Sequence, residues 1–158
     1  MENPYRQIFQ AFADAGIRYL VVGGVARSFH GYRRFTADLN ILLARDEENL
    51  EKMAKRMCQM PRLALDVLVD ASLRFEDFDR RKEWKRVWGI AIPVISMDDF
   101  AGMHGCPRGQ TNRGIDRDYL RRCKATTPEQ RLDWLAAALD FVREMERSNP
   151  PKHAPQKK

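Results

Sequence analysis

The sequence has few cysteines and no long apolar run. Its three cysteines, Cys58, Cys106 and Cys123, are an odd number without a CxxC pair. A disulfide framework or a structural zinc site is therefore not expected, and a reducing cytoplasm fits best. No apolar stretch approaches the roughly 20 residues that a membrane span needs, and the first ten residues lack the apolar region of a secretory signal. We expect a cytoplasmic protein with no membrane partner.

The sequence also lacks an internal repeat and a linker that would divide it. Its 158 residues, of which 44% are hydrophobic, suit a single domain with a real core. We expect this domain to span residues 1–148. Residues 149–158 are rich in Pro and Lys and have little to bury, which predicts a disordered basic tail. The net charge of +6 permits an anionic partner such as a nucleotide or a nucleic acid without requiring one.

Hydrophobic periodicity predicts strands and helices in mixed order. Because the two types do not alternate strictly, the pattern favours an α/β (α+β) fold with a short mixed β-sheet flanked by helices. Strands are expected at 17–22, 39–43, 63–69, 84–88 and 90–95. Helices are expected at 4–15, 25–30, 46–57 and 115–123, after Ser96, and after Thr127, with 74–82 a further helical candidate. Side chains expected to cap helices are Asn3, Asp46, Ser96 with Asp99, and Thr127 with Gln130.

The segment from Tyr19 to Leu43 carries the most informative residues. Gly23 and Gly24 follow an apolar strand, where glycine lets the backbone approach a ligand closely and the start of a helix favours phosphate. Asp38 enters the next strand, and Asn40 points to the same face because strand side chains alternate. Asp66 lies inside a further apolar strand. Three oxygen-bearing side chains near a phosphate-binding turn indicate magnesium-assisted phosphoryl or nucleotidyl transfer.

This segment, YLVVGGVARSFHGYRRFTADLNILL, resembles the signature of the polymerase beta-type nucleotidyltransferases. In that signature a hydrophobic residue and Gly-Gly or Gly-Ser are followed, about a dozen residues later, by Asp, a hydrophobic residue, and Asp or Glu. Here thirteen residues separate Gly24 from Asp38. The stretches LALDVLVD, IPVISMDDFAGMHG and RGIDRDYLRR resemble later parts of the family. The chain resembles in particular the small bacterial nucleotidyltransferases of toxin–antitoxin and abortive-infection systems.

The resemblance implies a nucleotidyltransferase fold and a set of residue roles. Asp38 and Asp66 would bind Mg²⁺, with Asp66 also orienting the acceptor. A nucleoside triphosphate would be held by Gly23, Gly24, Arg34 and His104. The acceptor would be a hydroxyl group of a protein or an RNA, and a toxin or antitoxin would be a partner.

Three positions depart from the family pattern. Asn40 stands where a second acid is usual, and it offers one neutral carbonyl oxygen to a metal. His104 and Ile115 stand where lysines are usual. Two hypotheses therefore stand: a nucleotidyltransferase that Asn40 weakens, and a catalytically inactive member of a toxin–antitoxin-like system that binds a nucleotide, a protein or RNA.

Other features have ordinary interpretations beside functional ones. Arg34 and its neighbour Arg33 suit either a phosphate grip or a plain basic loop. The basic stretch 113–124 is interpreted as a solvated helix face, although a basic RNA-binding protein remains a third hypothesis. The three tryptophans, Trp84, Trp88 and Trp134, are interpreted as core or rim residues rather than as a base-stacking platform.

Overall fold

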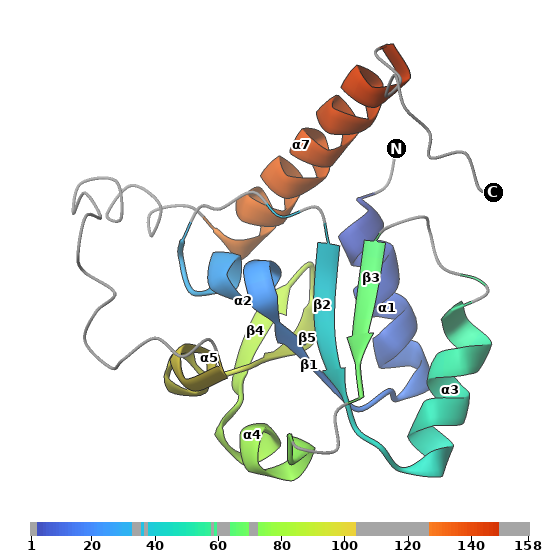
Figure 1. Ribbon diagram of the computed structural model, residues 1–158, viewed down its shortest axis with the longest axis vertical. Helices are drawn as coiled ribbons and strands as arrows, with labels where there is room; N and C mark the ends of the chain where they lie inside the picture. Colours follow the sequence, from blue (N-terminus) through green and yellow to red (C-terminus); the bar gives the residue numbers. More distant parts are fainter. Residues whose placement is uncertain are drawn as a thin grey trace, which may run out of the picture.

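The computed structural model describes residues 3–32, 36, 38–57, 59, 64–69, 73–103 and 127–148. Helices and strands follow one another in mixed order, as the sequence predicts (Figure 1). The helices are α1 (Pro4–Ala15), α2 (Gly23–Phe29), α3 (Glu47–Met57), α4 (Phe75–Arg81), α5 (Met97–Met103) and α7 (Pro128–Ser148). The strands are β1 (Tyr19–Val22), β2 (Asp38–Leu43), β3 (Ala64–Leu68), β4 (Glu83–Val87) and β5 (Ile90–Val94).

The five strands form one mixed sheet in the order β3-β2-β1-β5-β4. Strand β1 pairs antiparallel with β2 and parallel with β5, while β2 and β3 are parallel and β4 and β5 antiparallel. The α/β (α+β) class with a short mixed sheet flanked by helices is therefore confirmed. Strands β3 and β4 are the two edges of this sheet.

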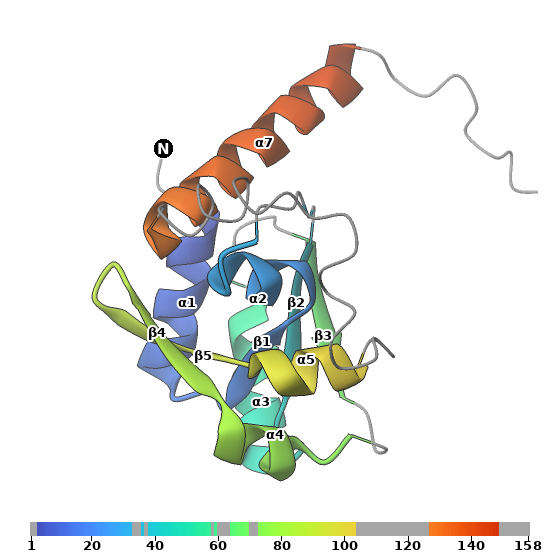
Figure 2. The ribbon, with the colours of Figure 1, turned by 90° about the vertical axis from the view of Figure 1, so that its left-hand side faces the viewer.

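Helix α1 anchors the core against the centre of the sheet. Its residues Phe9 and Phe12 are fully buried, and both rings contact the ring of Tyr19 in β1, with centroid distances of 6.4 and 4.7 Å. Burying each phenylalanine contributes roughly 1.5–3 kcal/mol. Helix α3 lies next to α1, and α7 contacts both α1 and α2 (Figures 1 and 2). This arrangement fixes the middle strands β1 and β2.

The predicted caps begin the helices as expected. The Asn3 side chain accepts a hydrogen bond from the Tyr5 amide at 2.9 Å. Ser96 and Asp99 open α5, where the Asp99 amide donates to the Ser96 hydroxyl oxygen at 3.2 Å. The second capping box is reciprocal, since the Gln130 amide donates to Thr127 Oγ1 and the Thr127 amide to Gln130 Oε1. Each cap satisfies amides that the helix itself leaves without a partner.

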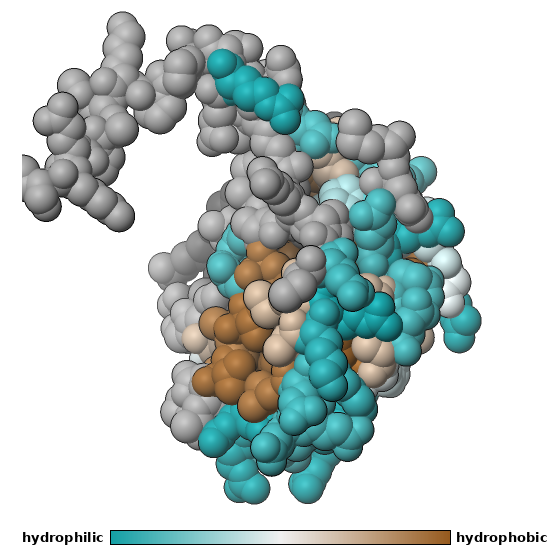
Figure 3. All heavy atoms as spheres, turned by 90° about the vertical axis from the view of Figure 1, so that its right-hand side faces the viewer, coloured by the Kyte–Doolittle hydropathy of each residue, from teal (hydrophilic) through white to brown (hydrophobic). Residues whose placement is uncertain are grey.

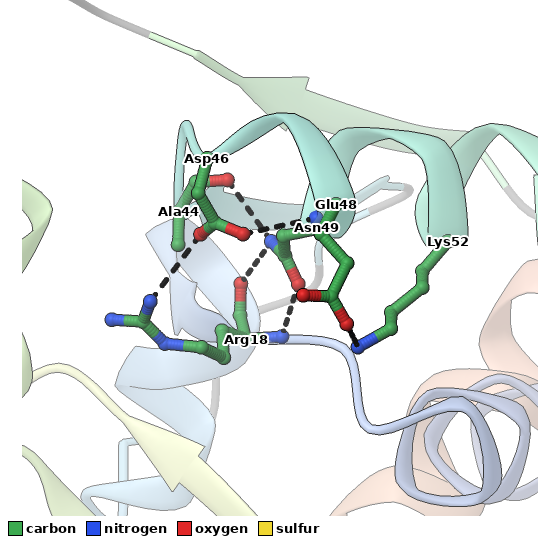
Figure 4. A network of polar contacts seen from close by, with 6 residues as sticks. All are labelled: Arg18, Ala44, Asp46, Glu48, Asn49 and Lys52. Carbon is green, nitrogen blue, oxygen red and sulfur yellow. Dashed lines mark hydrogen bonds and ion pairs between the residues drawn. The ribbon is translucent and has the colours of Figure 1, made fainter.

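A buried asparagine ties α3 to the ends of β1 and β2 (Figure 4). The Asn49 side chain, 2% exposed, accepts a hydrogen bond from the Arg18 amide at 2.7 Å and donates to the carbonyls of Arg18 and Ala44 at 2.9 and 3.0 Å. Its own amide donates to Asp46 Oδ1 at 3.0 Å, so the predicted cap at Asp46 is confirmed. The network holds the chain segments that leave β2 and enter β1.

One prediction needs correction. The helix expected at 25–30 begins two residues earlier, at Gly23, so both glycines lie inside α2. Of the two positions expected for Trp84, core or rim, the rim is the one observed, since this residue is 60% exposed on the edge strand β4. The predicted helix at 115–123, the basic stretch 113–124, the tail at 149–158 and the three cysteines lie outside the described residues. Within the described part of the chain, no helix is both long and apolar enough to cross a membrane.

Candidate functional site

Strand register brings the three predicted polar residues to one face of the sheet. Asn40 of β2 is the direct partner of Asp66 in the parallel strand β3. Asp38 precedes Asn40 by two residues in β2 and therefore faces the same way. Tyr19, which packs against α1, is the partner of Leu43 in β2. Leu43 is three residues from Asn40 and therefore points to the opposite face of the sheet. The cluster thus lies on the sheet face that points away from α1.

Neutral donors hold both carboxylate oxygens of Asp38. Thr36 Oγ1 donates to Asp38 Oδ1 at 2.6 Å, and Asn40 Nδ2 donates to Asp38 Oδ2 at 2.7 Å. All three side chains are half-buried. Hydrogen bonds to an ionised carboxylate are shorter and stronger than those between neutral groups, so this arrangement fixes the orientation of Asp38.

These contacts lower the pKa of Asp38. The hydrogen bond from Thr36 contributes most, followed by the one from Asn40. Partial burial acts in the opposite direction, because it disfavours the charged form. A backbone hydrogen bond to Asp38 makes a smaller contribution that lowers the pKa further. Asp38 is therefore an anion at neutral pH.

The two glycines lie directly against this cluster. Gly23 has a φ of 66°, and a Cβ atom there would lie 3.0 Å from Asn40 Cβ and Nδ2. A Cβ atom at Gly24 would lie 2.7 Å from Thr36 Cβ and Oγ1, closer than van der Waals contact permits. The Gly-Gly pair thus makes room for Asn40 and Thr36, in addition to the backbone conformation that Gly23 requires.

Asp66 lies on the edge strand β3 and is exposed. Apolar residues near it are also partly exposed: Leu68 is 37% and Val69 47% exposed. Figure 3 shows apolar surface next to strongly polar surface on the side of the molecule where β3 and α3 lie. Among the described residues, no group of three or more His, Cys, Asp and Glu side chains is arranged to hold a metal ion. The oxygen donors of the described site are two carboxylates, one amide and one hydroxyl.

The structure brings together five of the seven residues that the sequence singles out. Asp38, Asn40 and Asp66 share a sheet face, and Gly23 and Gly24 begin the helix beside them. Arg34 and His104 lie outside the described residues. Sequence reasoning missed Thr36, the strongest partner of Asp38. A threonine two residues before an acid is a common pattern, so only the hydrogen bond in the structure identifies it.

The described residues define a mixed α/β protein with a carboxylate–amide cluster at the start of β2. No protein-family model matches the chain, and no curated protein matches it.

Proposed function

We propose that the chain is a nucleotidyltransferase that moves a nucleoside monophosphate from a nucleoside triphosphate to a hydroxyl group of a protein or an RNA. The observation that carries the proposal is the cluster of Asp38, Asn40 and Asp66 on adjacent strands, beside the glycines that begin α2. The spacing of Gly24 and Asp38 in the sequence supports the same reading.

The donor set suits one magnesium ion. Magnesium prefers carboxylate oxygens and keeps several waters, and Asp38 and Asp66 supply two carboxylates from neighbouring strands. Asn40 adds one amide oxygen in place of a third charge. When bound, the ion neutralises charge on the phosphates during transfer. Asp38 and Asp66 would hold it, since they carry the negative charge of the cluster.

The residues of the chain would position the reactants for in-line transfer. Backbone N–H groups at Gly23 and Gly24 would face the phosphates, because the N-cap residue Val22 supplies no side-chain hydrogen bond there. Asp66 would accept the proton of the acceptor hydroxyl as its oxygen bonds to the α-phosphorus and pyrophosphate leaves. Arg34 and His104 enter the proposal from the sequence alone.

A second candidate function is nucleotide, protein or RNA binding without catalysis, within a toxin–antitoxin-like pair. The hydrogen bond from Asn40 Nδ2 to Asp38 Oδ2 favours it. A second acid at this position would repel Asp38 and call for a cation, whereas the amide satisfies Asp38 directly. A site that is stable without a cation has less need of the metal that transfer chemistry uses.

Calorimetric titration with ATP, GTP, CTP and UTP, each with and without Mg²⁺, tests the proposal. We expect magnesium-dependent binding of at least one nucleotide, lost in Asp38→Ala and kept in the control Asp98→Ala, an exposed acid of α5. Transfer to hydroxyl groups would then be followed with labelled nucleotide. Binding without transfer favours the second candidate. If no nucleotide binds, the enzyme proposal fails.

A further inference from the structure

A short cationic segment forms one edge of the sheet. Residues 80–86 read RRKEWKR and carry five cationic side chains against a single acid, Glu83. They run from the last turn of α4 into β4, the edge strand farthest from Asp66. Figure 2 shows β4 and the hairpin it forms with β5 on the side of the molecule that faces the viewer. The segment is separate from the proposed nucleotide site.

Trp84 is the most exposed large apolar residue of the described chain, at 60%. Charged side chains on an edge strand have an ordinary explanation, because they prevent pairing with other strands. An exposed indole does not serve that purpose, and it gains little for folding when it stays in water. Its exposure on a strand rich in cations points to a ligand that uses both an aromatic face and positive charge.

Two cations lie close to Trp84 in the chain, and one of them contacts its ring. The Lys82 ammonium lies 5.2 Å from the ring centroid. Arg86 follows Trp84 by two residues and is exposed on the same face of β4. In β5, Pro93 lies opposite Trp84 and Ala91 lies opposite Arg86, and both are uncharged. No carboxylate therefore opposes this face from the neighbouring strand.

The free positive charge of the segment centres on two arginines. Arg81 pairs with Asp99 at 2.8 Å, Lys85 with Glu83 at 2.7 Å and Lys82 with Asp79 at 2.8 Å. Within the described residues, Arg80 and Arg86 have no ion-pair partner, and both are exposed. Lys82, just before β4, and Arg86, within it, are each two residues from Trp84, and two residues of extended backbone span about 7 Å.

We propose that Trp84, Arg86 and Lys82 form a contact surface for single-stranded nucleic acid. A base stacks on the exposed surface of the indole, and the exposed guanidinium of Arg86 contacts a backbone phosphate beside it. Stacking accepts any base, because every base has a π-face. An acidic peptide satisfies the arginine but leaves the exposed indole without a stacking partner, so the aromatic residue favours nucleic acid.

Fluorescence anisotropy with labelled oligomers of about twelve nucleotides tests the surface, since such a length spans typical single-strand sites. Oligouridine and oligothymidine are titrated with the full chain. We expect Trp84→Ala to weaken binding about tenfold, with binding largely kept in Trp84→Phe, which retains a ring. Arg86→Ala is expected to weaken binding and to reduce the slope of log affinity against log salt by about 1.

Matched controls lie away from the segment. Trp134→Ala removes a tryptophan that is 39% exposed on α7, and Lys55→Ala removes an exposed cation of α3. Both are expected to bind like the parent. Preference for oligouridine identifies RNA as the partner, and equal binding identifies single strands of either kind; both support the proposal.

Two results overturn it. The first is equal affinity of Trp84→Ala and the parent for both oligomers, with circular dichroism showing that the variant is folded. The second is an equally large effect of Trp84→Ala and Arg86→Ala on binding of a labelled oligoglutamate peptide, which assigns the surface to an acidic peptide. If Trp84→Ala does not fold, the oligomer affinities of Arg86→Ala and Trp84→Phe are compared with that of the parent instead.

Discussion

Asn40 donates a hydrogen bond to Asp38 across 2.7 Å, so the two residues at the start of β2 act as one unit. An amide beside an ionised carboxylate supplies a donor where a second acid would supply repulsion. Thr36 holds the other oxygen of the same carboxylate. The site is therefore ordered by its own side chains, and a cation that enters must compete with two hydrogen bonds for Asp38.

The first prediction concerns Asn40→Asp. The substitution removes the donor and places a third carboxylate between Asp38 and Asp66, so we expect a loss of about 2–3 kcal/mol of stability without metal. For a chain of this size the melting temperature should fall by about 5–10 °C in EDTA. Added Mg²⁺ should restore much of this loss, because the ion binds only the folded site. Differential scanning fluorimetry in EDTA and in Mg²⁺ measures both effects.

Gln59→Glu is the matched control, because it adds the same charge at an exposed position. Its melting temperature should barely change in either condition. If Asn40→Asp melts like the parent in EDTA, the hydrogen bond to Asp38 contributes nothing to stability. If Mg²⁺ does not stabilise the variant, the three oxygen donors do not form a cation site.

The second prediction concerns pH and Thr36. Since the folded-state pKa of Asp38 is lowered, its hydrogen bonds stabilise the protein above the unfolded-state pKa of 3.8. This stabilisation is lost as the pH falls through the folded-state pKa. Thr36→Val should therefore cost about 1 kcal/mol at pH 7, a modest figure because solvent partly screens the carboxylate. The difference from the parent should shrink toward pH 3.

Urea unfolding at several pH values measures this difference. Thr36→Ser keeps the hydroxyl donor and should follow the parent at every pH. A Thr36→Val penalty of the same size at pH 7 and at pH 3 would mean that lost packing, and not the bond to Asp38, causes it.

Much of the site was open to prediction from local patterns, and the reasons are physical. Alternation along a strand has a period of two, so Asp38 and Asn40 had to share a face. Asp66 joined them because β2 and β3 pair in parallel with Asn40 opposite Asp66. Capping side chains such as Ser96 act within one helical turn, and their roles were also predictable.

Features that depend on distant parts of the chain were not predicted. The exposure of Trp84 follows from the place of β4 at a sheet edge, which the strand's own residues do not encode. The closeness of Thr36 to Gly24 joins residues twelve positions apart, which no local pattern encodes. The helix start at Gly23 was missed because glycine ordinarily disfavours helix interiors.

The third prediction concerns the buried amide of Asn49. Asn49→Ala leaves the Arg18 amide and the carbonyls of Arg18 and Ala44 without these partners in a nearly dry site. We expect a loss of about 2–3 kcal/mol, because an unsatisfied buried polar group costs its full desolvation. Glu51→Ala, at an exposed position of the same helix, should change stability by less than about 0.5 kcal/mol. Urea unfolding compares the two; equal small losses would show that water replaces the asparagine.

The fourth prediction compares two glycines of short helices. A Cβ atom at Gly24 would lie 2.7 Å from Thr36 Cβ and Oγ1, whereas one at Gly102 in α5 would meet nothing within 4 Å. Gly24→Ala should therefore cost about 1–3 kcal/mol, because the β-branched Thr36 cannot move without breaking its bond to Asp38. Gly102→Ala should be neutral or stabilise the protein by about 0.5–1 kcal/mol, since alanine is the better helix former. Thermal and urea unfolding of both variants measure the contrast. If Gly24→Ala proves as stable as Gly102→Ala, the start of α2 does not press on Thr36, and the glycine pair serves only the backbone conformation at Gly23.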